Sequence, residues 1–171
     1  MSIRPVLDTL LITLQRVDAP QASLLVEGLD RDTIAARLSS FPVHVAAEVI
    51  DYFSWRNGLR RDRQVEYELF PEAVMLSLDE ALTDYRMLCD AARKIAREAG
   101  VPASTVWDER WLPLFRHPAG GAYHVTVGGA APIQRAPIVS ILLQDASGAS
   151  IAFESLEALA VKANEWLLQK N

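Results

Sequence analysis

Cysteine is almost absent from this sequence: its 171 residues include one, Cys89. A single thiol can neither close an intramolecular disulfide nor build a thiolate zinc site, and a chain without disulfides suits a reducing compartment. We therefore expect a cytoplasmic protein. Cys89 falls at the edge of an apolar helical stripe, and this position favours a buried, unreactive thiol over a catalytic nucleophile.

Histidine is also scarce, and the motifs in which it does chemistry are missing. His44, His117 and His124 are scattered without H-x-x-x-H or H-E-x-x-H spacing, so no metal site is predicted. No G-x-S-x-G stretch presents a nucleophilic serine. The glycine pairs at 120–121 and 128–129 bracket a predicted strand, whereas a phosphate cradle joins a strand to a helix N-terminus. The sequence predicts neither a cofactor nor an enzyme.

Long apolar runs are missing as well. No stretch of about 18 apolar residues occurs, so a membrane-spanning helix is not expected. Arg4 and Asp8 interrupt the apolar positions of the first residues, a pattern unlike that of a signal peptide. With 50% hydrophobic and 23% charged residues, the chain has the composition of one globular domain spanning residues 1–171. Its net charge of −5 disfavours direct contact with nucleic acid and favours basic partners.

Helical spacing dominates the first half of the chain. Apolar residues recur at this spacing from Ile3 to Val17, and Asp18-Ala19-Pro20 then breaks the pattern. This predicts an amphipathic first helix. A short second helix should follow, capped at its start by Asp30 or Asp32.

A third predicted helix begins near Ala46 and runs A-A-E-V-I-D-Y-F-S-W before Asn57-Gly58 ends it. Its apolar positions form one face, which we expect to point toward the core. The opposite face carries Glu48, Asp51 and Ser54, which we expect to point toward solvent.

The longest predicted helix follows a short strand within Leu69–Leu76. The segment Ser77–Glu80 has the spacing of a capping box, so the helix should start there. Its inward stripe is predicted to run from Leu78 to Ala99 and to include Ile95. Gly100 should end the helix, because glycine tolerates the left-handed conformation that closes many helices.

The hydrophobic period changes to two after Trp111. The stretches W-L-P-L-F, A-Y-H-V-T-V, P-I-V-S-I-L-L and S-I-A-F are separated by turn residues and are typical of successive antiparallel strands. In the second stretch, Tyr123 and His124 should lie on opposite faces because side chains alternate along a strand. Helical spacing returns from Leu156 to Leu168. We therefore predict an α+β fold in which about four to six antiparallel strands pack against helices.

Four arginines lie within eight residues at the end of the third predicted helix: Arg56, Arg60, Arg61 and Arg63. Guanidinium groups suit carboxylates and phosphates, and the neighbouring Trp55 would supply an interface anchor. The cluster is therefore a candidate partner-binding surface. A solvated loop is the alternative interpretation, because acidic residues at positions 62 and 66 partly neutralise the charge.

Five stretches occur in a characteristic order: IAARLSSFPVHVAAEVIDYFSWRNG, WLPLF, GGAYHVTVGG, PIVSILL and IAFESLEALAVKANEWL. Together they resemble the SUKH superfamily, which includes fungal cell-wall-assembly regulators and many bacterial immunity proteins. The resemblance implies a SUKH-like core over residues 30–168 and an N-terminal helical extension over residues 1–27.

The resemblance also implies roles for single residues. Family members commonly place an acidic or amide residue after the glycine pair and again after the strand, where this chain has Ala122 and Gly128. Tyr123, His124 and Thr126 remain as the polar side chains of this segment, and we add Tyr123 and His124 to the partner-binding candidates. The remaining correspondences are structural: a helix-ending turn at Asn57-Gly58, a strand entry at Trp111 and Pro113, a turn at Gly120-Gly121, and terminal packing by Phe153 and Trp166.

For function, the resemblance implies a non-enzymatic protein-binding module: an immunity protein that neutralises a cognate bacterial toxin by occluding its surface. A nuclease is one candidate toxin. Inhibition of this kind needs complementary area and a few buried anchors, and no catalytic group in the inhibitor. One alternative is a regulatory or scaffold protein that bridges host partners. Another is a small hydrolase, which would require a pocket holding titratable groups with shifted pKa values.

Overall fold

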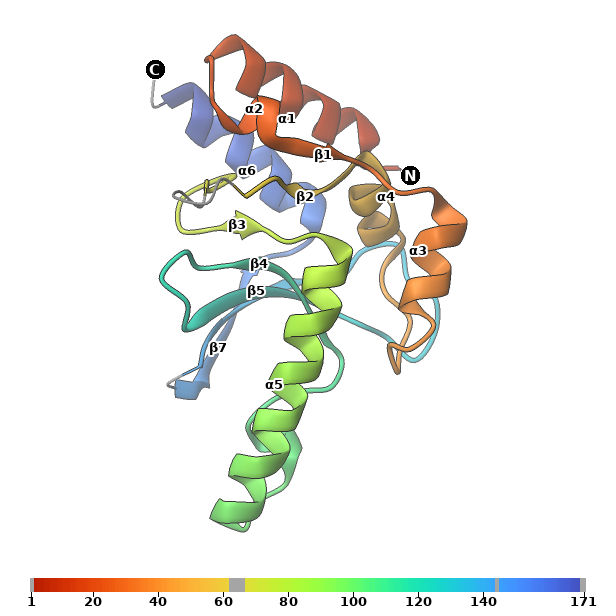
Figure 1. Cartoon of the computed structure of the whole chain (residues 1–171), viewed down its shortest axis with the longest axis vertical. Coiled ribbons are helices and arrows are strands. Elements are labelled where there is room, and N and C mark those ends of the chain that lie inside the picture. The colour runs from red at the N-terminus through yellow and green to blue at the C-terminus, as the bar shows by residue number, and fades with distance from the viewer. Residues whose placement is uncertain (1, 62–66, 144, 170–171) are drawn as a thin grey trace.

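The computed structural model describes residues 2–61, 67–143 and 145–169. Within these ranges the chain forms six α-helices, a five-stranded antiparallel sheet and a separate two-stranded sheet (Figure 1). The predicted α+β class and the predicted antiparallel sheet are confirmed.

The elements follow one another in the order helices, sheet, helix. The helices are α1 (Arg4–Arg16), α2 (Gln21–Leu24), α3 (Arg31–Leu38), α4 (Ala47–Trp55), α5 (Leu78–Ala99) and α6 (Leu156–Gln169). A 3-10 turn, η1, spans Ala103–Thr105. The strands are β1 (Leu25–Glu27), β2 (Arg56–Leu59), β3 (Val74–Met75), β4 (Trp111–Arg116), β5 (Ala122–Val127), β6 (Ile138–Leu142) and β7 (Asp145–Phe153).

The larger sheet is a meander with the order β3-β4-β5-β6-β7, and each neighbouring pair is antiparallel. Its register places His124 opposite Ser140 and Tyr123 opposite Ile141. Because side chains alternate along a strand, His124 and Tyr123 point to opposite faces of the sheet, as the sequence predicts.

The long helix α5 covers the face to which Tyr123 points. Leu88 and Cys89 of α5 form a buried cluster with Trp107, Tyr123 and Val125. The C-terminal half of α5 extends past the end of the sheet, together with the chain that follows it (Figure 1). The middle of α5 therefore covers this face of the sheet, and the C-terminal half of the helix projects beyond it.

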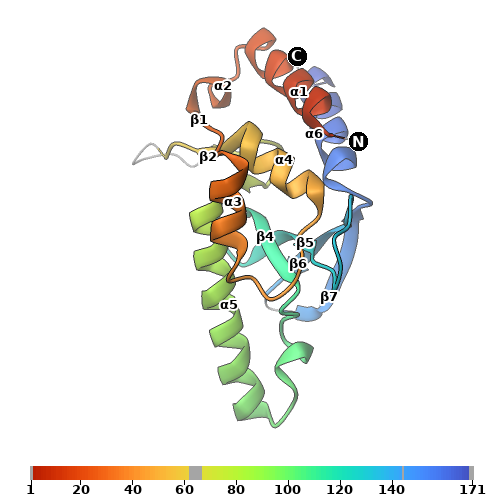
Figure 2. The same cartoon turned by 90° about the vertical axis from the view of Figure 1, so that its right-hand side faces the viewer.

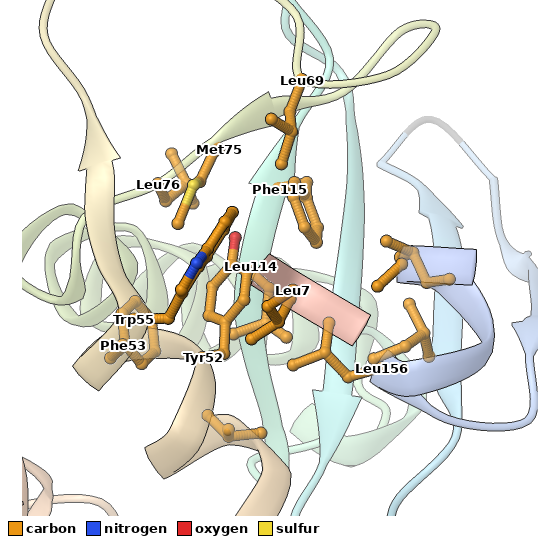
Figure 3. Packing of buried hydrophobic residues seen from close by; sticks show 14 of the residues in the cluster. Leu7, Tyr52, Phe53, Trp55, Leu69, Met75, Leu76, Leu114, Phe115 and Leu156 are labelled. Atoms are coloured by element: carbon orange, nitrogen blue, oxygen red, sulfur yellow. The ribbon is translucent and has the colours of Figure 1, made fainter. Parts of the chain in front are cut away.

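The opposite side of the sheet carries α1, α4 and α6 (Figure 2). Leu7 of α1, Tyr52 of α4, Phe115 of β4 and Leu156 of α6 belong to a single buried cluster (Figure 3). The strand β1 also pairs antiparallel with β2. The N-terminal helix predicted from the sequence is thus present, and it shares its core with the segments after residue 30.

Two acidic residues of α4 lie where the sequence does not predict them. Glu48 and Asp51, expected on the solvent side, are 2% and 6% exposed. Asp51 accepts a hydrogen bond from the backbone N–H of Ile3 and pairs with the guanidinium of Arg31. The prediction was wrong because α1 and α6 cover the polar face of α4, and the buried carboxylates are compensated by partners distant in sequence.

The Asn57-Gly58 pair follows α4 but lies within β2. Gly58 has a φ of +84°, and an added Cβ would come within 2.6 Å of the backbone nitrogen of Ser77. Asn57 Oδ1 accepts a hydrogen bond of 2.8 Å from the N–H of Leu78. The pair therefore fits β2 closely against the start of α5 and satisfies one of the helix's free N–H groups.

The start and end of α5 match the sequence prediction, whereas its buried stripe differs. The capping box between Ser77 and Glu80 is present, and Gly100 closes the helix at φ +70°. Ile95, predicted to be inward, is 49% exposed. The N-terminal part of the predicted stripe is buried as expected, at Leu78, Leu82, Leu88 and Ala92, and the other buried positions of the helix are Ala81, Cys89 and Ala96.

The predicted strand within Leu69–Leu76 is shorter than expected. Regular pairing is limited to β3, and a bridge between Phe70 and Ala73 encloses a tight turn at Pro71-Glu72. Glu72 adopts a φ of +61°, which non-glycine residues rarely occupy. This turn lies beside the face of the sheet to which His124 points.

Candidate functional site

Trp55 was predicted to be an interface anchor, but its side chain belongs to the core. It is 1% exposed and lies near Met75 and Leu76 (Figure 3). The last turn of α4 directs the indole inward, where it leaves no surface for a partner. The predicted role of Trp55 as an interface anchor is therefore wrong, and the residue packs in the core.

Arg56 and Arg60 each contact their own chain. The guanidinium carbon of Arg56 lies 5.4 Å from the centre of the Trp55 ring, and its Nη1 donates a 2.6 Å hydrogen bond to the carbonyl of Trp55. Arg60 donates a 2.6 Å hydrogen bond to the carbonyl of Ser23. These two side chains attach the β2 segment to α2 and to the end of α4.

Arg61 extends toward a different element. Its guanidinium lies 2.7 Å from a carboxylate oxygen of Glu80, which also belongs to the capping box of α5. Arg63 lies outside the described residues. The described arginines therefore contact three separate elements, and a partner-binding role for them stays a prediction.

Tyr123 and His124 are adjacent in sequence, and their side chains point to opposite faces of the sheet. Tyr123 is buried under α5, and burial together with the nearby carboxylate of Asp84 raises the pKa of its phenol to about 12. His124 points to the other face of the sheet. Both residues line a small hollow at the edge of the sheet, and His124, unlike Tyr123, also lines a larger one.

That larger hollow is a groove of about 390 Å³ between α6 and the face of β5, β6 and β7 to which His124 points, and we call it the α6 groove. Three aromatic side chains form its walls: Phe70, Phe153 and Trp166. His124 and Ser140 lie on its sheet side. It adjoins a smaller hollow of about 200 Å³, because Glu72, His124 and Ser140 line both.

The position of α6 over the groove is set by buried polar contacts at its first turn. Ser155 Oγ accepts a hydrogen bond of 3.1 Å from the N–H of Ala158, as a helix-capping serine does. Glu48 of α4 accepts hydrogen bonds from the N–H groups of Leu156 and Glu157. The negative carboxylate lies at the positive end of the helix, where it stabilises the start of α6.

The electrostatics of the groove centre on His124. Burial lowers the pKa of its imidazole, and the carboxylate of Glu72 acts in the opposite direction. The ring of Phe70 lies 5.9 Å from the imidazole centre. His124 Nδ1 is buried and has no hydrogen-bond partner. The imidazole is therefore held neutral near pH 7 by an apolar environment.

Charged groups border the groove on both sides. Lys162 of α6 lies 2.9 Å from Glu165 one turn along the helix. On the opposite side, the N–H of Glu72 donates a 2.8 Å hydrogen bond to the carboxylate of Glu68, which supports the unusual backbone conformation of the turn. A strained residue held in this way is a common feature of binding and catalytic sites.

The groove has one feature of a hydrolase site and lacks another. Ser140 lies directly across the strand pair from His124, whose lowered pKa suits a general base. A serine–histidine–acid system also needs a carboxylate that orients the base through its second nitrogen. The unpaired Nδ1 of His124 shows that this orienting contact is absent from the described residues. The groove as it stands offers an apolar surface with charged borders.

Most groove residues carry no signal of their role in the sequence. Of the partner-binding candidates only His124 contributes to it, while the resemblance assigned Phe153 and Trp166 to packing. Glu72 and Lys162 were not singled out at all. The sequence features at these positions are a proline inside a strand pattern, Pro71, and a lysine on the last predicted helix, Lys162. Neither feature indicates a groove.

Residues 2–61, 67–143 and 145–169 contain no group of three or more His, Cys, Asp and Glu side chains placed to hold a metal ion. None of the helices in these ranges is both long and apolar enough to cross a membrane.

Comparison of the sequence with known proteins gives no relative from which a role for the groove can be transferred. No protein-family model matches the chain. No curated protein matches it either.

Proposed function

We propose that this protein is a protein-binding module that captures its partner in the α6 groove. The observation that carries the proposal is the composition of the groove: three aromatic walls, a half-buried histidine whose pKa is lowered, and a lysine and a glutamate at opposite borders. Aromatic clusters with polar borders are the usual anatomy of protein interfaces. A large side chain of the partner would enter between Phe153 and Trp166.

The size of the groove agrees with this role. A volume of about 390 Å³ is at the lower end of the range for small-molecule sites and accommodates one or two partner side chains. Buried anchors of this kind supply most of the binding energy of an interface, and the surrounding contacts mainly exclude water.

The fuller proposal follows the resemblance to the SUKH superfamily. In it the protein is an immunity protein of the bacterial cytoplasm that neutralises a cognate toxin by covering the toxin's active surface. The net charge of −5 supports rapid encounter with a basic toxin such as a nuclease. A regulatory or scaffold protein with the same groove is the alternative, and a toxin gene beside this one would favour the immunity role.

A hydrolase is the second candidate from a different class. The pairing of Ser140 with His124, together with the lowered pKa of the imidazole, is the observation in its favour. The two candidate functions predict different effects of Ser140→Ala. The substitution would abolish turnover in a hydrolase, whereas it would leave partner capture by a binding module nearly unchanged. Ester and amide substrates screened against the purified protein test this directly.

The decisive experiment is capture of the product of the neighbouring gene. Ala152 is exposed and lines the groove, so Ala152→Arg would fill the groove with a charged side chain without disturbing the core. Ala91→Arg, at an exposed position of α5, is the matched control. We expect the wild type and Ala91→Arg to co-purify with the toxin and to rescue growth, and Ala152→Arg to do neither. Equal capture by all three proteins would exclude the groove.

A further inference from the structure

The α6 groove continues along the first turns of α6. A second hollow of about 530 Å³ shares Phe153 and Lys162 with it and adds charged residues at its border. The two hollows form a continuous band with an apolar centre, which we call the α6 band. Its charged residues are Glu72, Arg135, Glu154, Glu157, Lys162 and Glu165.

The α6 band carries an excess of negative charge. Arg135 pairs with Glu157, and Lys162 pairs with Glu165. After these two ion pairs, Glu72 and Glu154 provide the surplus. His124 adds no positive charge at neutral pH, because burial lowers its pKa.

The two surplus carboxylates lie on either side of the aromatic centre. Glu72 belongs to the turn beside Phe70, and Glu154 directly follows Phe153 at the end of β7. Positive side chains that flank an apolar anchor would therefore meet a carboxylate on each side while the anchor contacts the aromatic walls. Negative polymers such as nucleic acids and anionic lipid surfaces would be repelled by the same charges.

We propose that the α6 band recognises a partner segment in which an aromatic or branched aliphatic anchor is flanked by lysine or arginine. This inference rests on the proposed function and adds the chemistry of the partner to it. The aromatic walls provide the affinity, and the carboxylates provide the selection for positive charge.

The probe is a pair of blocked peptides, acetyl-Lys-Trp-Lys-amide and acetyl-Glu-Trp-Glu-amide, titrated into the ¹⁵N-labelled full chain at low salt. We expect the basic peptide to shift amide signals of β5, β7 and α6 and to bind at least about fivefold more tightly than the acidic one. Raising the ionic strength should reduce the difference, since exposed charges are screened. Equal affinities, shifts confined to other elements, or no binding at millimolar peptide would overturn the inference.

Two exposed carboxylates make the test specific. Glu72→Gln combined with Glu154→Gln removes the surplus charge, and we expect the preference for the basic peptide to fall to about twofold or less. Glu98→Gln, on the exposed side of α5, is the control and should keep the wild-type preference. A double variant with unchanged preference would contradict the assignment of these carboxylates.

Failure of this inference is distinguishable from failure of the proposed function. Ala152→Arg could block toxin capture while the wild type shows no preference between the two peptides. That result would overturn the selection for positive charge and leave the groove as the binding surface. Self-association of the free protein that Ala152→Arg abolishes would assign the band to a second copy of the chain and overturn the inference.

Discussion

The buried carboxylate of Glu48 accepts a hydrogen bond of 3.1 Å from the backbone N–H of Leu156, the first residue of α6. The same oxygen accepts a 3.0 Å hydrogen bond from Ala136, and the second oxygen accepts one from Glu157. One side chain of α4 thus holds the start of α6 and the segment before β6. The groove depends on this junction, because α6 forms one of its walls.

Replacement of Glu48 should be strongly destabilising. Glu48→Ala leaves two buried N–H groups and one partly buried N–H group without this acceptor, and we expect a loss of about 2–4 kcal/mol in the free energy of unfolding. Urea titration followed by circular dichroism measures this. Glu98→Ala, at an exposed site, should be nearly neutral. A Glu48→Ala protein as stable as the wild type would show that these contacts do not hold the junction.

Gly58 should be far less tolerant of a side chain than Gly120. Both have positive φ, +84° and +75°, but a Cβ at Gly58 meets the backbone of Ser77 and a Cβ at Gly120 meets nothing within 4 Å. Gly120→Ala should therefore lower the free energy of unfolding by about 1 kcal/mol, through backbone strain alone. Gly58→Ala should lower it by at least about 1 kcal/mol more. Thermal unfolding of the two variants compares them directly. Equal losses would mean that β2 is not fixed against α5.

Truncation of Leu88 should destabilise the protein much more than truncation of Ile95, although both residues belong to the apolar stripe that the sequence predicts. Leu88 is buried against Trp107, so Leu88→Ala should cost about 2–4 kcal/mol of unfolding free energy. Ile95 is half exposed, and Ile95→Ala should cost less than about 1 kcal/mol. Equally large losses for the two variants in chemical denaturation would contradict the exposure of Ile95 and support the stripe predicted from the sequence.

The stability of the protein should contain a pH-dependent contribution from His124. Its folded-state pKa is lowered from 6.5 by burial, with Glu72 opposing, so the unfolded state binds more protons at mildly acidic pH. This contribution is fully present above pH 6.5 and is lost as the pH falls from there through the folded-state pKa. His124→Gln removes it. As the pH falls from 7.5 to 5, the wild type should lose more unfolding free energy than the His124→Gln variant. A difference between the two proteins that does not change with pH would contradict the burial of the imidazole.

Features governed by neighbours in sequence were predictable. The capping box at Ser77–Glu80, the left-handed Gly100 and the opposite faces of Tyr123 and His124 all follow from local rules, and all are present. Local patterns reach only a few residues along the chain. Within that distance, backbone geometry and capping decide the structure.

The errors concern residues whose partners are distant in sequence. Glu48 has the periodicity of a solvent-facing residue, but the N–H groups that it binds lie 88 to 109 residues away. Trp55 was assigned to the surface because arginines follow it, while its indole packs on Met75 and Leu76 of another segment. The α6 groove was missed for the same reason, since its residues come from the Phe70 turn, three strands and α6.

Capture of the proposed partner, a toxin, by the groove variants tests the central claim most directly. Isothermal titration of the purified toxin into wild type, Ala91→Arg and Ala152→Arg gives three dissociation constants under identical conditions. We predict equal affinities for the first two and at least about a hundredfold loss for Ala152→Arg, because the substituted side chain occupies the place of the partner's anchor. A folded Ala152→Arg protein that binds the toxin as tightly as the wild type would contradict the account.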